Sequence, residues 1–442
     1  MSQENLRNDD LAAYWMPFTP NKAFKVNPRI MERAEGQFYY TSDGRKVRDG
    51  FSGLWCSNLG HCHPKITEAI QEQAGSMDYS PAFNFGHAPA FELANRVADQ
   101  FPGDLNHVFF TNSGSEAVDT ALKMAIAYHR IRGEGTRTRL IGRASGYHGV
   151  GFGGISVGGM VNNRKFFGSL LPGVDHLTMP YTPDVSAYSR GLTDEDVDQY
   201  GKELENIIAL HDASTIAAVI IEPVVGSAGV FTPPKGYIER LREITAKHGI
   251  LLIFDEVITA FGRLGASNAC HYFGVVPDIV TTAKGINNGT VPMGATIASK
   301  TIYDTFIEGT KAGVEFFHGF TYSAHPLAVA AGLAAQDVFE QEGVYEQVSA
   351  LTGYFEDLLH GLKDEAYVAD VRNLGYMGGL TIAQRDGVMG ARAYDVFLKS
   401  YEAGVTVRSN GDTIAIAPIL TSTKEDLEDI IDCVRKGLQA VN

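Results

Sequence analysis

A lysine and an aspartate each follow an apolar run that has the composition of a buried strand. Lys284 comes directly after the run 279–283, and Asp255 comes directly after the run 251–254, twenty-nine residues earlier. Short runs rich in β-branched and aromatic residues predict buried strands of a parallel sheet. We therefore expect both side chains at the carboxyl edge of one sheet, where open α/β sheets bind ligands.

These two side chains can do a specific kind of chemistry together. A lysine amine can form a Schiff base with an aldehyde, and a nearby carboxylate can keep a heteroaromatic nitrogen protonated. Pyridoxal 5'-phosphate (PLP) requires both groups from its protein. The alternative is that Asp255 and Glu256 cap a helix and that Lys284 is solvated, since most charged loop residues face solvent.

A Gly/Ser turn supplies a candidate phosphate site. The predicted strand 108–110 is followed by Ser113, Gly114 and Ser115, and then by a helical pattern with Val118, Ala121, Leu122 and Ala125 on one face. A turn of this kind at the start of a helix presents free backbone N–H groups and the positive end of the helix dipole. The alternative is a simple helix cap in which Ser113 and Glu116 form a capping box.

Two further polar segments follow predicted strands. Tyr147 and His148 come after the strand 140–141, and Glu222 comes after the strand 217–221. The Tyr147 ring can lie against a flat cofactor. Singly, these residues fit ordinary core or strand-end positions, but with the Gly/Ser turn, Asp255 and Lys284 they form one set in chain order.

Taken together, these residues resemble the class III (ω-) aminotransferases of PLP fold type I. The resemblance covers the chain from about Trp15 to its C-terminus, and it is closest for the branch that pairs ω-amino acids such as β-alanine with pyruvate. The motifs that carry it are 112–117, 147–149, 255–257 with 261–263, Asp278 with 283–284, and 318–322; those that indicate the branch are 15–19, 52–55, 407–408 and 411–413.

The resemblance implies PLP as cofactor and assigns roles to the polar residues. Lys284 would bind PLP covalently, Asp255 would pair with its pyridinium nitrogen, and Thr321 of the partner subunit would join the phosphate site. The remaining cofactor contacts are expected from Ser113, Gly114, Ser115, Tyr147, His148, Glu222 and Val257.

The resemblance also implies a substrate pocket around Arg408. A guanidinium can pair bidentately with the carboxylate of a keto acid and swing aside when a substrate has none. The walls are expected from Phe18, Leu54, Trp55, Phe85, Tyr147, Ser227 and Ala228. Without the flanking motif, Arg408 would be interpreted as part of a surface ion pair. The chain departs from the family at Ala260, where glycine is usual, and at Ala415, where close relatives have glutamine.

The expected reaction is a ping-pong transamination. In the first half-reaction an ω-amino acid or primary amine would transfer its amino group to the cofactor, and an aldehyde, ketone or semialdehyde would be released. In the second, pyruvate would take up that amino group to give L-alanine. Open alternatives are a different donor, such as taurine or a polyamine, and an aminomutase or decarboxylase, because fold and cofactor do not fix the reaction. A nucleotide-binding oxidoreductase is suggested only by the glycines at 149, 151, 153 and 154, which lack the fingerprint spacing and a clear following helix.

Length and composition set the architecture. The chain has 442 residues, of which 44% are hydrophobic and 20% charged, so it can bury a large core. We expect an α/β fold with a mostly parallel sheet between helices and a smaller α+β domain. The expected division is an N-terminal segment 1–69 that joins the small domain, a large PLP-binding domain 70–325 and a C-terminal small domain 326–442.

Charge and cysteine content restrict partners and location. A formal net charge of −15, without a basic cluster, disfavours nucleic acid and anionic membranes as partners. The first five residues show no signal pattern, and four scattered cysteines predict no disulfide framework, so we expect a cytoplasmic protein. The cluster Cys56, His61, Cys62 and His63 matches no common zinc spacing, and no metal is predicted. The family implies a homodimer or homotetramer.

Overall fold

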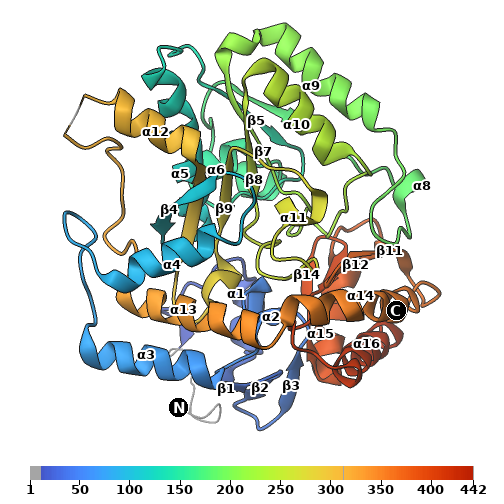
Figure 1. Cartoon of the computed structure of the whole chain (residues 1–442). Coiled ribbons are helices and arrows are strands. Elements are labelled where there is room, and N and C mark those ends of the chain that lie inside the picture. The colour runs from blue at the N-terminus through green and yellow to red at the C-terminus, as the bar shows by residue number, and fades with distance from the viewer. Residues whose placement is uncertain (1–10, 312, 442) are drawn as a thin grey trace.

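A seven-stranded sheet forms the centre of the computed structural model, which describes residues 11–311 and 313–441 (Figure 1). The segment 1–5 considered above lies outside these residues. The strand order is β4 (Leu105–Thr111), β10 (Gly294–Ser299), β9 (Ile279–Thr282), β8 (Leu251–Asp255), β7 (Ile216–Ile221), β5 (Arg139–Arg143) and β6 (Val174–Leu177). Only β10 runs antiparallel to its neighbours. The predicted α/β class with a mostly parallel sheet is confirmed.

Helices cover both faces of this sheet because its strands are apolar on both sides. In β7, Ala218 and Ile220 pack toward α5 (Gly114–Ile131), whereas Val219 and Ile221 join the larger core on the other face. The four apolar positions predicted on α5 are all buried. The other helices of this part are α4 (Ala88–Ala98), α6 (Phe152–Val157), α7 (Val161–Arg164), α8 (Pro183–Ser186), α9 (Val197–His211), α10 (Tyr237–His248), α11 (Ala269–Phe273) and α12 (Lys300–Gly309), with the 3-10 turns η3 (Ala213–Thr215) and η4 (Lys284–Asn287).

The two ends of the chain form two smaller sheets beside the central one (Figure 1). β13 (Val405–Thr406) pairs in parallel with β3 (Lys46–Asp49), and Arg48 forms an ion pair with Asp429 of α16 at 2.7 Å. The remaining elements here are α1 (Asn21–Val26), β1 (Met31–Glu35), β2 (Phe38–Thr41), α2 (Ser52–Trp55), α14 (Val344–His360), β11 (Val368–Leu374), β12 (Met377–Ile382), α15 (Ala391–Ala403), β14 (Arg408–Asn410), β15 (Thr413–Ile416) and α16 (Lys424–Gln439).

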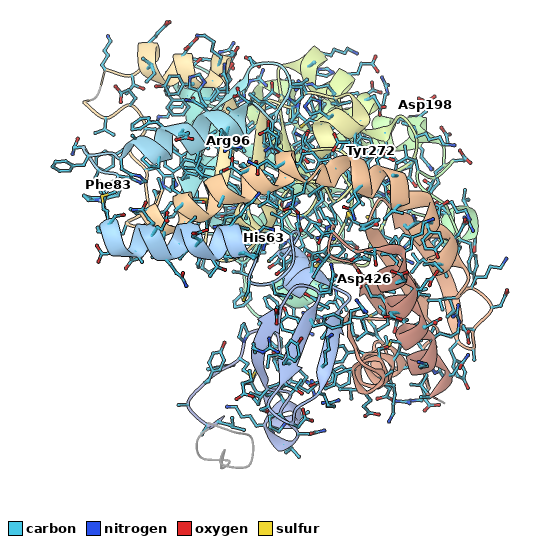
Figure 2. The ribbon with its side chains drawn as sticks, turned by 60° about the horizontal axis from the view of Figure 1, so that its bottom comes forward. His63, Phe83, Arg96, Asp198, Tyr272 and Asp426 are labelled. Carbon is cyan, nitrogen blue, oxygen red and sulfur yellow. The ribbon has the colours of Figure 1, made fainter. Side chains whose placement is uncertain are left out.

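Two helices at the expected domain boundaries pack against each other. The boundary 69/70 falls inside α3 (Pro64–Ser76), and position 326 is the first residue of α13 (Pro326–Gln341), which packs across α3, α4 and η4. Figure 2 shows Arg96 of α4 beside α13, where it pairs with Asp337 at 2.6 Å. Because α13 packs against α4 and η4 of the large sheet unit, and α3 packs against α13, we propose that this unit extends from about residue 64 to 341. Across the described residues, none of the helices is long and apolar enough to cross a membrane.

Candidate active site

A cavity of about 630 Å³, including its open mouth, lies at the carboxyl edge of the central sheet. Asp255 ends β8, Glu222 directly follows β7 and Lys284 directly follows β9, so three adjacent parallel strands deliver their polar residues to one place. The lining residues are Gly114, Ser115, Tyr147, His148, Gly149, Glu222, Val224, Asp255, Val257, Ile258, Ala283 and Lys284. The structure thus brings together the polar residues that the sequence predicted after separate strands.

The N-terminus of α5 forms one end of the cavity. Gly114 and Ser115 are its first two residues, so their N–H groups have no intrahelical acceptor. A Cβ at Gly114 would lie 2.9 Å from both γ-carbons of Val257, so a larger residue would close this end. Ser113 does not line the cavity: its hydroxyl oxygen accepts a hydrogen bond from the Glu116 N–H at 3.2 Å. The helix cap and the candidate phosphate site therefore coexist, on neighbouring residues.

The glycine run after Tyr147 packs against α5. Gly149 has φ +89°, and a Cβ there would lie 2.4 Å from the Ser115 hydroxyl oxygen, which accepts a hydrogen bond from the Val150 N–H at 3.1 Å. Gly154 donates its N–H to Asp119 of α5 at 2.9 Å. The six-residue helix α6 begins within this run, where the sequence indicated no clear helix. These glycines permit close packing beside Ser115, which accounts for them without a dinucleotide fingerprint.

Asp255 is held in place by two hydrogen bonds. His148 Nδ1 donates to Asp255 Oδ2 at 2.8 Å, and the Val257 N–H donates to Oδ1 at 3.1 Å. Only 6% of Asp255 is exposed, and His148 Nε2 is buried without a hydrogen-bond partner among the described residues. The sequence left open that Asp255 and Glu256 cap a helix. Of these two residues only Glu256 does so: its carboxylate accepts a hydrogen bond from the Ala269 N–H at the start of α11 at 2.5 Å.

Glu222 joins two loops at the edge of the sheet. Its carboxylate oxygens accept the N–H groups of Tyr147 at 2.8 Å and Gly226 at 3.0 Å. Burial raises the pKa of Glu222, and burial with the nearby carboxylates of Asp255 and Glu222 raises the pKa of Tyr147. Glu222 therefore fixes the loop that carries Tyr147 and the loop that begins after β7.

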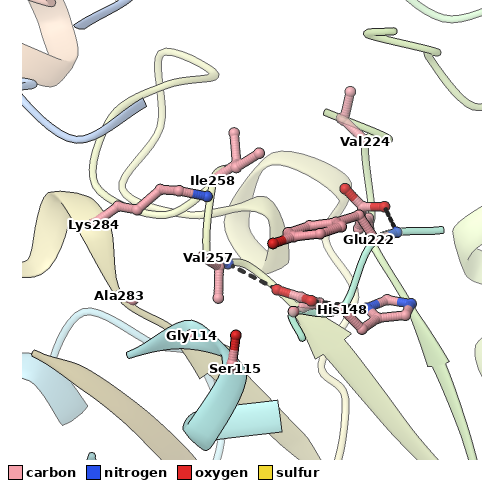
Figure 3. Close-up of a pocket in the computed structure, with 12 residues that line it drawn as sticks. Gly114, Ser115, His148, Glu222, Val224, Val257, Ile258, Ala283 and Lys284 are labelled. Atoms are coloured by element: carbon pink, nitrogen blue, oxygen red, sulfur yellow. Dashed lines mark hydrogen bonds and ion pairs between the residues drawn. The ribbon is translucent and has the colours of Figure 1, made fainter. Parts of the chain in front are cut away.

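Lys284 extends into the cavity toward Val257 and Ile258, opposite Glu222 and His148 (Figure 3). It is the first residue of η4 and has φ +44°, a backbone conformation uncommon outside glycine. Burial lowers the pKa of Lys284, which favours the neutral, nucleophilic amine. The alternative of a solvated lysine is therefore not what the structure shows.

Arg408 begins β14 and has no carboxylate partner. It is half-buried, and no ion pair links it to any residue between 11 and 441 that the structure describes. Burial lowers its pKa, and the neighbouring Tyr147 opposes that change. Ala415 of β15 lies directly across the strand from Arg408 and is 5% exposed. The surface-pair alternative is thus not observed.

Of the expected substrate residues, Tyr147 lines the cavity, whereas Arg408 and the others are not among its lining residues. The Trp55 ring is 3% exposed and packs edge-on against Phe51, with ring centroids 4.7 Å apart, in an apolar cluster that also contains Val224 and Ile258 of the cavity lining. Phe18, Leu54, Phe85 and Thr321 are exposed, and Ser227 and Ala228 are partly buried in the loop after Glu222.

Sequence reasoning missed Val224, Ile258 and Ala283 as cavity residues and named Gly149 only as part of a motif. The usable signal was position, since each lies within three residues of a polar residue that ends or follows a strand. In the Cys/His cluster, His61 pairs with Asp49 at 2.8 Å, and His63 lies 3.4 Å from Glu342. Ala260 is buried, so its extra methyl group is accommodated.

The cavity fits PLP in shape and chemistry. The cofactor is flat, with a phosphate, a ring nitrogen and an aldehyde at separate positions. The cavity offers free N–H groups and a hydroxyl at Gly114 and Ser115, a buried carboxylate at Asp255 and a half-buried amine at Lys284.

Comparison with known proteins gives one answer. A family model described as aminotransferase class-III matches residues 20–438. An omega-aminotransferase of Caulobacter vibrioides is 53% identical over 434 residues, which cover 98% of this chain and 99% of the relative. A beta-alanine–pyruvate aminotransferase of Pseudomonas aeruginosa is 49% identical, with 98% and 96% covered. The crystal structure of an (S)-enantioselective omega-transaminase from Thermomicrobium roseum superposes with a TM-score of 0.93 at 35% identity, with 99% of both chains covered.

Proposed function

The chain belongs to the class III aminotransferases, and we propose that it transfers the amino group of an ω-amino acid such as β-alanine, or of a primary amine, to pyruvate. The observation that carries this proposal is Arg408, a half-buried guanidinium beside Tyr147 with no carboxylate partner among the described residues. A buried cation without a protein counter-ion is suited to a substrate carboxylate. The names of the similar enzymes support the same donor and acceptor classes.

The enzyme depends on PLP, as members of this family do. When bound, PLP supplies an electron sink for the substrate carbon that carries the amino group. We propose that Gly114 and Ser115 bind its phosphate and that Lys284 binds its aldehyde. Asp255, oriented by His148, would pair with the ring nitrogen and hold a proton there.

Lys284 would carry out the proton transfer, and Arg408 would bind the substrate carboxylate. The Lys284 amine, whose pKa is lowered by burial, would accept the proton that the substrate carbon loses and could deliver it again. Arg408 binds the carboxylate of pyruvate with its two parallel N–H donors and leaves the site open for a donor that has no carboxylate at that position. One site can then accept two substrates of different charge.

The test is a pair of half-reactions followed by the visible absorbance of the lysine-bound cofactor. β-Alanine alone should bleach this absorbance without releasing carbon dioxide, and pyruvate alone should then restore it with formation of alanine. Release of carbon dioxide would indicate a decarboxylase, and restoration by other keto acids but not by pyruvate would contradict the proposed acceptor.

We further propose that the chain acts as a homodimer or homotetramer in the cytoplasm. Support for self-association comes from exposed aromatic side chains, among them Phe83 at the edge of the molecule (Figure 2), and from Thr321, which is exposed and absent from the cavity lining. The four free cysteines support a reducing compartment. Light scattering tests the oligomeric state. A mixture of Lys284→Ala and Thr321→Ala subunits tests whether Thr321 contributes to the active site of the other subunit. If it does, the hybrid dimer contains one intact site, and activity should return only in that hybrid.

A further inference from the structure

The segment 56–60 lies along the turn that begins at Lys284. Asn288 accepts a backbone N–H of this segment at 2.8 Å and donates its amide to one of the segment's carbonyls at 2.7 Å. A Cβ at Gly289 would lie 2.5 Å from the Cβ of Cys56. The N-terminal part of the chain is thus fitted closely against the turn that carries the lysine.

Asn58 connects this turn to a buried arginine. Its amide nitrogen donates to the Phe261 carbonyl at 2.9 Å and lies 2.6 Å from the position that a Cβ on Gly285 would occupy. Its amide oxygen accepts a hydrogen bond from Arg263 at 2.5 Å. Gly285 directly follows Lys284, so Asn58 touches both the residue after the lysine and the arginine.

Arg263 carries a buried positive charge without a direct counter-ion. It is fully buried and donates to the Pro418 carbonyl at 2.6 Å, the Ser52 hydroxyl at 3.1 Å and Asn58. All three acceptors are neutral, its Nε has no partner, and no ion pair joins it to a described residue. Because a buried charge is costly when it is not paired, its retention points to an electrostatic role.

A matched contrast comes from Arg372, which is also fully buried. Arg372 forms an ion pair with Asp370 at 2.5 Å and donates to backbone carbonyls of the loop after Glu222. Its charge is therefore compensated where it stands, and it belongs to another part of the interface between the chain ends and the central sheet. Arg263 and Arg372 are equally buried, but among the described residues only Arg372 has a carboxylate as its ion-pair partner.

Four charged or titratable groups face the Lys284 amine. Asp255 of β8, Glu222 after β7 and Cys56 of the adjacent segment raise the pKa of Lys284, whereas burial and the positive charge of Arg263 lower it. Arg263 itself faces Asp49, Cys56 and Tyr376, and burial lowers its pKa, although an arginine remains protonated at neutral pH. Arg263 is thus a cation near the lysine, and its effect on the lysine pKa opposes that of the carboxylates of Asp255 and Glu222.

We propose that Arg263 is a positioning residue for Lys284: through Asn58 it fixes the turn that carries the lysine, and it places a positive charge without a direct counter-ion beside that turn. This inference rests on the proposed function in one respect, that Lys284 is the residue that binds PLP. The buried hydrogen bond between Asn58 and Arg263 would then influence the reactivity of Lys284 directly.

The test is the pH dependence of PLP association with the apoenzyme, followed by the absorbance that appears when Lys284 binds the aldehyde. Wild type must show this signal and Lys284→Ala must not, which tests the proposed function separately. In Arg263→Gln the loss of the nearby positive charge raises the pKa of the lysine, so the midpoint should move upward by about half a unit or more. In Arg263→Lys, which keeps the charge, it should remain near that of wild type.

Two further variants keep the inference falsifiable if Arg263→Gln does not fold. Asn58→Asp places a carboxylate on the guanidinium and neutralises it in place, so the midpoint should again move upward. Arg372→Gln removes an equally buried but paired arginine and should lower the unfolding temperature without moving the midpoint. A midpoint within about 0.2 units of wild type in both Arg263→Gln and Asn58→Asp, or an equal shift in Arg372→Gln, would overturn the proposal.

Discussion

The cofactor end and the substrate end of the candidate site are built in different ways. At the cofactor end, His148, Glu222 and Asp255 are 1%, 4% and 6% exposed and are fixed by hydrogen bonds within the chain. At the proposed substrate end, Leu54 and Phe85 are 52% and 72% exposed and do not line the cavity. A rigid end holds one constant ligand, whereas an open end leaves room for exchanging substrates and for a second subunit.

The largest effect is expected at the rigid end from Lys284→Ala. The variant should lose turnover by many orders of magnitude because a covalent catalyst and proton carrier is removed. It should still bind PLP noncovalently, since the helix terminus at Gly114 and the carboxylate of Asp255 do not depend on the lysine. Steady-state rates and equilibrium dialysis with PLP measure the two quantities, and retention of more than about a per cent of activity would refute the role.

A smaller loss, still at least about a hundredfold, is expected from Asp255→Asn. The amide cannot hold a proton on the ring nitrogen by charge, and it also changes the bond to His148. Because the amide has nearly the same shape, the unfolding temperature should change little. A single-turnover rate with β-alanine equal to that of wild type would show that this carboxylate does not support the chemistry.

The same contrast explains what the sequence could predict. Asp255, Glu222 and Lys284 were predictable because each ends or follows an apolar run, and parallel strands bring such residues to one edge. Trp55 stays a proposed substrate residue, but its packing against Phe51 and near the distant C-terminal strands could not be predicted, because a local pattern does not contain those contacts. The contacts of Asn58 and Arg263 were missed for the same reason, since they join segments about two hundred residues apart.

Arg408→Ala should separate the two half-reactions at the open end. The loss of a charge-assisted contact to the pyruvate carboxylate should lower kcat/KM for pyruvate about ten- to a hundredfold. A simple amine donor without a carboxylate should react within a few-fold of wild type. Arg408→Lys should recover only part of the loss, because it keeps the charge but not the two parallel donors. Equal slowing of both half-reactions would assign Arg408 a structural role.

The smallest effect is expected from Ala415→Gln. Ala415 lies across the strand from Arg408, so a glutamine there can accept a hydrogen bond from the guanidinium and compete with the substrate carboxylate. The rate with pyruvate should fall roughly two- to fivefold. Ala415→Met adds similar bulk without a strong acceptor and serves as the control. If Met slows the reaction as much as Gln, the effect is steric and not a competition for Arg408.

The most direct test of the proposed aminotransferase is borohydride trapping of PLP followed by peptide mass analysis at three stages. The resting enzyme should carry the reduced cofactor on Lys284. After incubation with β-alanine alone this label should disappear, because the freed lysine no longer holds the aldehyde, and after addition of pyruvate it should return. A label on another residue, or a label on Lys284 that persists through incubation with β-alanine, would contradict the account.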